Sequence, residues 1–179
     1  MTKYVALIRG IGPADPRMTN DKLRGVFEAL GFTDVQSVIS SGNIIFTSAI
    51  RSTEKLEAMI EAAWPKMLGF ERSTIVKSEQ QLRALLDANM FGELTHGKSS
   101  YLLVTFFKRP TTVNFELPYQ RPGKPYRLVS CGNNTLCSVT EYASASTSDL
   151  MIWLEKQFGK EITSRTPLTI ERILKKMAV

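Results

Sequence analysis

The stretch VISSGNIIF, from Val38 to Phe46, has apolar residues on both sides of a Ser-Ser-Gly-Asn unit. Glycine and asparagine tolerate positive φ angles, so the stretch predicts two strands joined by a hairpin turn. A second version, LVSCGNNTL, runs from Leu128 to Leu136 in the other half of the chain. The two stretches together indicate an internal duplication, with one hairpin in each half.

Hydrophobic spacing around the first hairpin predicts the element order β-α-β-β-α-β. Thr19 and Ser52 are suitable N-caps for the two helices, and Ser78 precedes a third helix. The expected strands cover residues 4–8, 35–39, 44–47 and 72–76, and the first two helices cover residues 20–30 and 53–68.

The second half predicts a similar series around its own hairpin. Strands are expected at residues 101–107, 126–130, 135–139 and 162–164, with a helix at 147–158 and a last helix capped by Thr166. The proline-rich segment 110–125 is expected to be a loop, or at most a short helix. We therefore predict an α+β protein of two ferredoxin-like repeats, residues 1–90 and 100–179, each carrying an extra helix and packed as one compact unit.

The stretches ALIRGIG (6–12), EALGFTDV (28–35) and SGNIIF (41–46) carry a family resemblance. With them the chain resembles the bacterial domain-of-unknown-function family numbered 1697. The resemblance implies a duplicated ferredoxin-like fold and no established activity. The chain differs from the family pattern at residues 12–16 and, between Arg165 and Thr169, at residues 166–168.

Composition describes an ordinary globular protein. The chain has 179 residues, of which 43% are hydrophobic and 22% charged. It has no apolar run long enough for a signal peptide or a membrane span, so we expect a soluble, cytoplasmic protein. Cys131 and Cys137 are expected to be free thiols. A two-residue loop at Asn133-Asn134 would place them on opposite faces of the hairpin, and a three-residue loop would place them opposite each other.

The topology predicts a binding site at one end of the first sheet. A right-handed crossover makes the first two strands parallel, so the loop after residue 8 lies beside the hairpin turn and the start of the first helix. An arginine and a helix N-terminus favour anions there. The predicted ligand-binding residues are Arg9, Gly10, Thr19, Ser41, Gly42 and Asn43. The alternative is structural: Arg9 pairs with a carboxylate such as Asp15, and the glycines only form turns.

Net charge and one loop raise a second possibility, nucleic acid. The chain carries a formal net charge of +6, which favours acidic partners. Aromatic residues interleave with the basic ones in the loop 108–127, a pattern that suits single-stranded nucleic acid, although a solvated basic surface is the simpler explanation. The basic residues of this strip are Lys108, Arg109, Arg121, Lys124 and Arg127.

Catalytic groups do not form a recognisable motif. His96 is the single histidine, in a loop that starts at Gly92 and ends at Gly97, and Ser41 has no base near it in sequence. No metal-ligand spacing or P-loop is present, and we expect no cofactor. The predicted function is therefore binding of an anionic ligand, either a phosphorylated or nucleotide-like small molecule or nucleic acid. A small-molecule enzyme with an unidentified base and a protein-interaction module are the alternatives.

Overall fold

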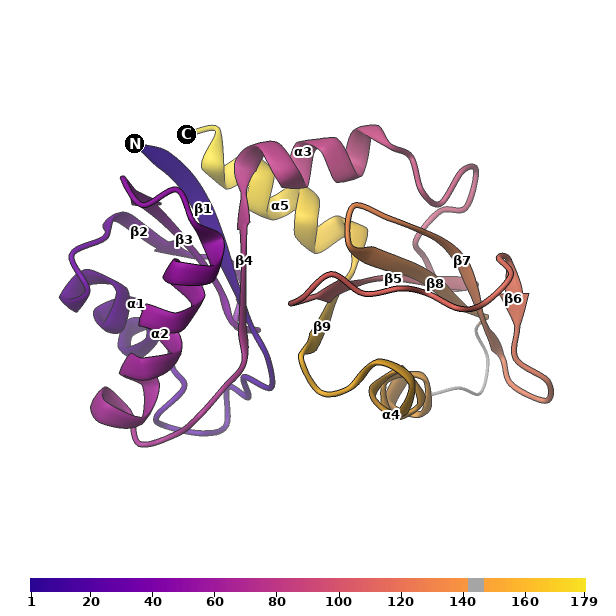
Figure 1. Cartoon of the computed structure of the whole chain (residues 1–179), viewed down its shortest axis with the longest axis horizontal. Helices are drawn as coiled ribbons and strands as arrows, with labels where there is room; N and C mark the ends of the chain where they lie inside the picture. The colour runs from indigo at the N-terminus through magenta and orange to yellow at the C-terminus, as the bar shows by residue number, and fades with distance from the viewer. Residues whose placement is uncertain (142–146) are drawn as a thin grey trace. The chain divides into compact units, whose positions relative to one another are not determined.

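A computed structural model describes residues 1–141 and 147–179 of the chain (Figure 1). Within these residues the chain forms two antiparallel sheets and five helices. It divides into two compact units. The first consists of Met1–Arg83 and Arg172–Val179, and the second is Ala84–Glu171. The α+β class predicted from the sequence is confirmed.

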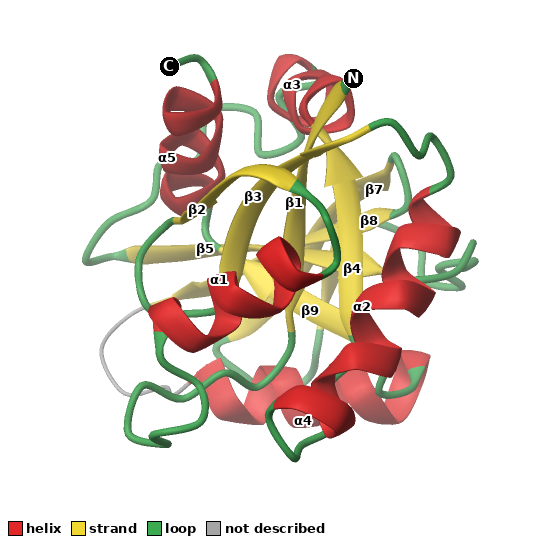
Figure 2. Ribbon diagram, turned by 90° about the vertical axis from the view of Figure 1, so that its left-hand side faces the viewer, coloured by secondary structure: helices red, strands yellow, loops and turns green. Residues whose placement is uncertain are grey.

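The sheet of the first unit has the strand order β2-β3-β1-β4, with every neighbouring pair antiparallel. Helices α1 and α2 cover one face of this sheet (Figure 2). The elements are β1 (Thr2–Ile8), α1 (Asn20–Ala29), β2 (Thr33–Ser37), β3 (Asn43–Ser48), α2 (Thr53–Met67) and β4 (Thr74–Ser78).

Burial along the central strands follows the apolar runs of the sequence. Every residue of β1 from Tyr4 to Ile8 is at most 2% exposed. Successive side chains of a strand point to opposite faces, so both faces of this sheet are covered, as the continuous apolar runs predict. On the helical side, Phe27 of α1 packs against Phe46 and Trp64, with ring centroids 5.2 and 5.9 Å away.

Side chains accept hydrogen bonds from the backbone N–H groups along the edge of β4 that has no neighbouring strand in this sheet. The Thr74 N–H donates to Glu61 at 2.8 Å, and the Val76 N–H donates to Glu57 at 2.9 Å, both carboxylates coming from α2. Ser78 and Gln81 form a reciprocal capping box, because each backbone N–H donates to the other's side chain. Edge donors satisfied in this way are poor templates for another strand.

The sheet of the second unit has the order β6-β7-β8-β5-β9. Helix α3 (Glu79–Asp87) leads into this unit, and helix α5 (Pro167–Met177) leads out of it. The proline-rich segment contains the short strand β6 and no helix. The remaining elements are β5 (Ser100–Phe107), β6 (Tyr119–Gln120), β7 (Tyr126–Gly132), β8 (Thr135–Glu141), α4 (Thr147–Phe158) and β9 (Ile162–Arg165).

The two hairpins differ although their sequences look alike. In the first, Gly42 lies in the loop with φ +78° and Asn43 begins β3. In the second, Gly132 still belongs to β7 and pairs with Thr135, so the turn consists of Asn133 and Asn134, both with positive φ. The two four-residue units therefore form different turns. Pairing in the second hairpin runs to Gly132 and Thr135, at the turn itself, whereas the last pair of β2 and β3 is Ser37 with Ile44.

Candidate functional site

Three loops of the first unit meet at one end of its sheet, and Arg9 lies among them. The Ile8 N–H donates to the Gly42 carbonyl at 2.8 Å, and the Arg9 N–H donates to the Ser73 carbonyl at 3.0 Å. Asn20, the first residue of α1, donates its side-chain N–H to the Ile39 carbonyl at 3.2 Å. The structure thus brings together the segments that the topology predicted to be neighbours.

Gly42 is required for this meeting. Its φ of +78° is a left-handed conformation, which glycine adopts without cost. A Cβ at this position would lie 2.6 Å from Cγ1 of Ile11 and 2.9 Å from the carbonyl oxygen of Ile8. The loop after β1 therefore rests directly on the backbone of the turn.

Asn43 and Thr19 have structural contacts within the first unit. Asn43 is fully buried, and its amide donates to the Val38 carbonyl at 3.1 Å and to the Ser41 hydroxyl at 3.0 Å. The Thr19 hydroxyl accepts from the Lys22 N–H and caps α1. Both side chains shape the loops around the candidate site. Gly10 and Thr19 are exposed, Arg9 and Ser41 are half-buried, and Gly42 and Asn43 are buried.

Arg72 belongs to the same place and was not predicted. Its Nε donates to the Gly10 carbonyl at 3.3 Å, and its guanidinium lies over the Phe70 ring, 5.7 Å from the centroid. Arg17 contacts the same ring at 5.9 Å. Two guanidinium groups on one aromatic ring hold positive charge in a fixed position.

These two arginines differ in how their charge is balanced. Arg17 pairs with Asp15 at 2.8 Å, and its hydrogen bonds lower the pKa of the Asp15 carboxyl to about 2. Arg72 donates only to backbone carbonyls, of Gly10 and Glu71, and has no ion pair within the described residues. The charge of Arg72 is therefore available to an anion.

The basic strip of the second unit is mostly engaged in contacts inside that unit. Arg121 lies over the Trp153 ring, 4.9 Å from the centroid, and donates to the Tyr126 hydroxyl. Lys124 pairs with Asp149 at 2.9 Å, and Arg127 pairs with Glu141 at 2.8 Å.

The remaining residues of the strip region are also constrained. Lys108 is 8% exposed, whereas Arg109 is exposed. The rings of Phe115 and Tyr119 pack on Trp153, with centroid distances of 5.5 and 6.2 Å. These rings fill a hydrophobic cluster, so they are not presented as platforms for stacked bases.

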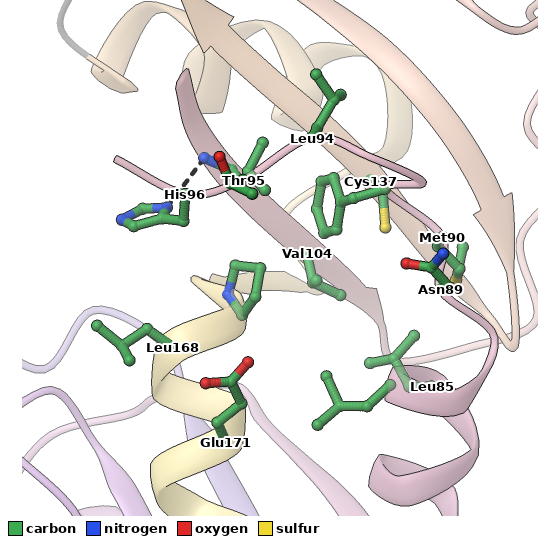
Figure 3. Close-up of a pocket in the computed structure, with 14 residues that line it drawn as sticks. Leu85, Asn89, Met90, Leu94, Thr95, His96, Val104, Cys137, Leu168 and Glu171 are labelled. Atoms are coloured by element: carbon green, nitrogen blue, oxygen red, sulfur yellow. Dashed lines mark hydrogen bonds between the residues drawn. The ribbon is translucent and has the colours of Figure 1, made fainter. Parts of the chain in front are cut away.

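A cavity of about 430 Å³ lies within the second unit (Figure 3). Helix α3, the loop after it, strands β5 and β8 and the start of α5 provide its walls. Most of the lining is apolar, including Leu85, Leu102, Val104 and Leu168. Such a volume and lining are typical of small-molecule sites.

His96 and Cys137 also line this cavity. The His96 Nδ1 accepts from the Leu102 N–H at 3.1 Å, which places the proton of a neutral imidazole on Nε2. Burial raises the pKa of the Cys137 thiol to about 12, so it is protonated at neutral pH and is a poor nucleophile. The two cysteines are free, and Cys137 is opposite Ser130, as a two-residue turn predicts.

Comparison with known proteins places the chain in a family. A family model described as "Protein of unknown function (DUF1697)" matches residues 1–125. The chain belongs to this family. The resemblance seen in the sequence is thereby confirmed. No curated protein matches the chain.

A solved structure of a bacterial protein has a similar fold. The chain is similar over its whole length to "conserved bacterial protein SP0830 from Streptococcus pneumoniae", with a TM-score of 0.72 and 24% identity. The match covers 100% of this DUF1697 chain and 99% of the other. At this identity the similarity describes the fold.

Two further kinds of functional feature are absent from the described residues. The described residues contain no group of three or more histidine, cysteine, aspartate or glutamate residues placed to hold a metal ion. Among the helices that the structure describes, none is long and apolar enough to cross a membrane.

Proposed function

We propose that the protein binds a small anionic ligand, phosphorylated or nucleotide-like, at the loop end of the first sheet. The observation that carries this proposal is Arg72, whose guanidinium is fixed by Phe70 and the Gly10 carbonyl and forms no ion pair among the described residues, although its charge also helps to lower the pKa of Asp15. A guanidinium held in place binds phosphate or carboxylate oxygens in two-point fashion, with little entropy lost on binding.

Neighbouring groups extend the proposed site. Arg9 follows β1 directly and adds a second positive charge to the same group of loops. Gly10 adopts a left-handed conformation with φ +65°, and its backbone is exposed beside Arg72. The Ser41 hydroxyl belongs to the turn and is oriented by the Asn43 amide, from which it accepts a hydrogen bond at 3.0 Å. Gly42, Asn43 and Thr19 take part by holding these loops in place.

A small anion suits the protein better than nucleic acid. Lys124 and Arg127 of the basic strip have carboxylate partners, and Arg121 is stacked on Trp153. Cations paired in this way contribute little counterion release on binding a phosphate backbone. Nucleic acid at Lys108 and Arg109 remains the second candidate partner, and an enzyme acting on the bound anion and an interaction module remain alternatives.

The proposal is tested by thermal unfolding with pyrophosphate at low ionic strength. Pyrophosphate is expected to raise the melting temperature of the wild-type protein, because a ligand that binds the folded state stabilises it. Arg72→Ala should lose this rise. Arg83→Ala is the matched control, since Arg83 is an exposed arginine paired with Glu79 on α3, and it should keep the rise.

Two outcomes would contradict the proposal. The first is an equal rise for wild type and Arg72→Ala, and the second is no rise for the wild type at any concentration. Circular dichroism of Arg72→Ala without ligand separates loss of binding from loss of folding. A single-stranded oligonucleotide in the same assay tests the second candidate, with Lys108→Ala/Arg109→Ala as its variant.

We also propose that the two sheets descend from one duplicated ferredoxin-like repeat. The orders β2-β3-β1-β4 and β7-β8-β5-β9 support this, since each has the four strands in corresponding positions. In this proposal the second copy has lost its first helix, since no helix lies between β5 and β7. The compact units differ from the proposed repeats 1–90 and 100–179 at their C-terminal ends: residues 84–90 belong to the second unit, and residues 172–179 belong to the first. A cytoplasmic location is proposed as well, supported by the two free cysteines.

A further inference from the structure

The cavity of the second unit is separate from the proposed anion site and has a different chemistry. Its walls combine helix α3, strands β5 and β8, and helix α5. Leu85, Val104 and Cys137 face the same space in Figure 3, although each is at most 5% exposed. An apolar group that enters this space loses its contact with water and gains packing contacts.

Charge on the cavity lining comes from one residue, Glu171. No lysine or arginine lines the cavity, although the chain as a whole carries a net charge of +6. The Glu171 carboxylate points toward the cavity from the second turn of α5 (Figure 3). Within the described residues it has neither an ion pair nor a hydrogen bond from a side chain. A carboxylate beside apolar walls favours a cation and repels an anionic ligand.

Polar groups of the cavity lining further restrict the chemical class of the ligand. Asn89 and Thr95 also line the cavity and supply amide and hydroxyl oxygens as acceptors. His96 offers its Nε2–H as a donor, because its Nδ1 is occupied by the Leu102 N–H. The lining thus has acceptors for an ammonium group and one donor for a hydroxyl or carbonyl on the same molecule.

We infer that this cavity binds a small primary amine with an apolar body, with the ammonium group at Glu171 and the body against Leu85, Val104 and Leu168. The volume of about 430 Å³ accommodates one ring with a short chain. This inference goes beyond the anion site, since it concerns another unit, another set of residues and a ligand of opposite charge.

Three probes of similar shape test the inference on the full chain. They are 2-phenylethylamine, 2-phenylethanol and 3-phenylpropionate, which share the phenylethyl body and differ in charge. Binding is followed by methyl NMR, with the leucine and valine methyl groups labelled. The amine should shift the methyl signals of Leu85, Val104 and Leu168. Its affinity should exceed that of the alcohol by about three- to tenfold, as for a partly exposed ion pair, and the acid should bind most weakly.

Variants then assign the charge preference to Glu171. Glu171→Gln should reduce the amine affinity to that of the alcohol and leave the alcohol affinity unchanged. Glu54→Gln is the matched control, because it makes the same chemical change at an exposed residue of α2 that does not line the cavity. It should leave all three affinities unchanged.

The outcomes decide the inference. Equal affinities of the acid and the amine for the wild-type protein, or an amine affinity that Glu171→Gln does not change, would overturn the preference for a cation. An absence of methyl shifts with all three probes would overturn the binding site itself. The comparison of probes on the wild-type protein needs no variant, so it decides the matter even if Glu171→Gln fails to fold. Pyrophosphate binding is unaffected by either result.

Discussion

Replacing Gly42 with alanine tests how tightly the loop after β1 rests on the first hairpin. The substitution has two costs. A φ of +78° costs an L-residue about 1–2 kcal/mol. The new Cβ would also lie 2.6 Å from Cγ1 of Ile11 and 2.9 Å from the carbonyl oxygen of Ile8, so side chain and backbone must both move. Overpacking of this kind costs about 1–3 kcal/mol. We expect Gly42→Ala to lower the free energy of unfolding by about 2–5 kcal/mol.

Gly31→Ala separates the two costs. Gly31 has φ +83°, and a Cβ there would meet no atom within 4 Å. It should therefore show the conformational cost alone, about 1–2 kcal/mol. The difference between the two variants measures the contact of Ile8 and Ile11 with the turn.

Urea unfolding followed by tryptophan fluorescence gives the measurement. The chain has two tryptophans, Trp64 in the first unit and Trp153 in the second, so a Trp153→Phe background reports on the unit that contains both glycines. Equal free energies of unfolding for Gly42→Ala and Gly31→Ala would refute the reasoning. They would mean that the loop carrying Arg9 and Gly10 moves freely off the turn.

Two further predictions concern titratable groups. At pH 8 a thiol reagent should react rapidly with Cys131 alone, because Cys131 is exposed and burial raises the pKa of Cys137 to about 12; Cys131→Ser should remove the rapid phase. The Asp15 carboxyl should titrate near pH 2 in an NMR experiment, and Arg17→Ala should move its pKa up toward 3.8. Since the folded-state pKa is depressed, the stabilising contribution of Asp15 is present above about pH 4 and is lost as the pH falls toward 2. An unchanged Asp15 pKa in Arg17→Ala would contradict this assignment.

Local features of the fold were predictable from the sequence. The caps at Thr19, Ser52 and Ser78 depend on residues three positions apart, and the structure has each of them. The two-residue turn at Asn133 and Asn134 was one of two alternatives, and the paired strands select it. The two hairpins differ in spite of their similar sequences, because strand register depends on tertiary pairing, which local sequence does not determine.

The candidate sites were predictable only in part. The predicted topology placed Arg9 beside the turn around Ser41 and Gly42. The order of helices and strands along the chain is enough to predict that β1 and β2 run parallel, so the ends of both strands lie at the same end of the sheet. Arg72 was missed because β4 brings it to Gly10 from 62 positions away. A single arginine beside Glu71 in the loop before β4 gives no periodic signal.

The cavity of the second unit had no signal in the sequence. Its lining residues come from α3, the following loop, two strands and α5, and each segment shows only ordinary apolar spacing. His96 is held by the Leu102 N–H, a contact that local sequence does not encode.

The most direct test of the anion site is a ¹H–¹⁵N NMR titration of the wild-type protein with pyrophosphate. The account predicts saturable shifts of the backbone amides of Gly10, Gly12 and Ser41 and of the side-chain Nε–H of Arg72. Signals of the second unit, such as the amide of Leu102, should stay in place. Shifts confined to the basic strip at Lys108 and Arg109, or no saturable shift at all, would contradict the account.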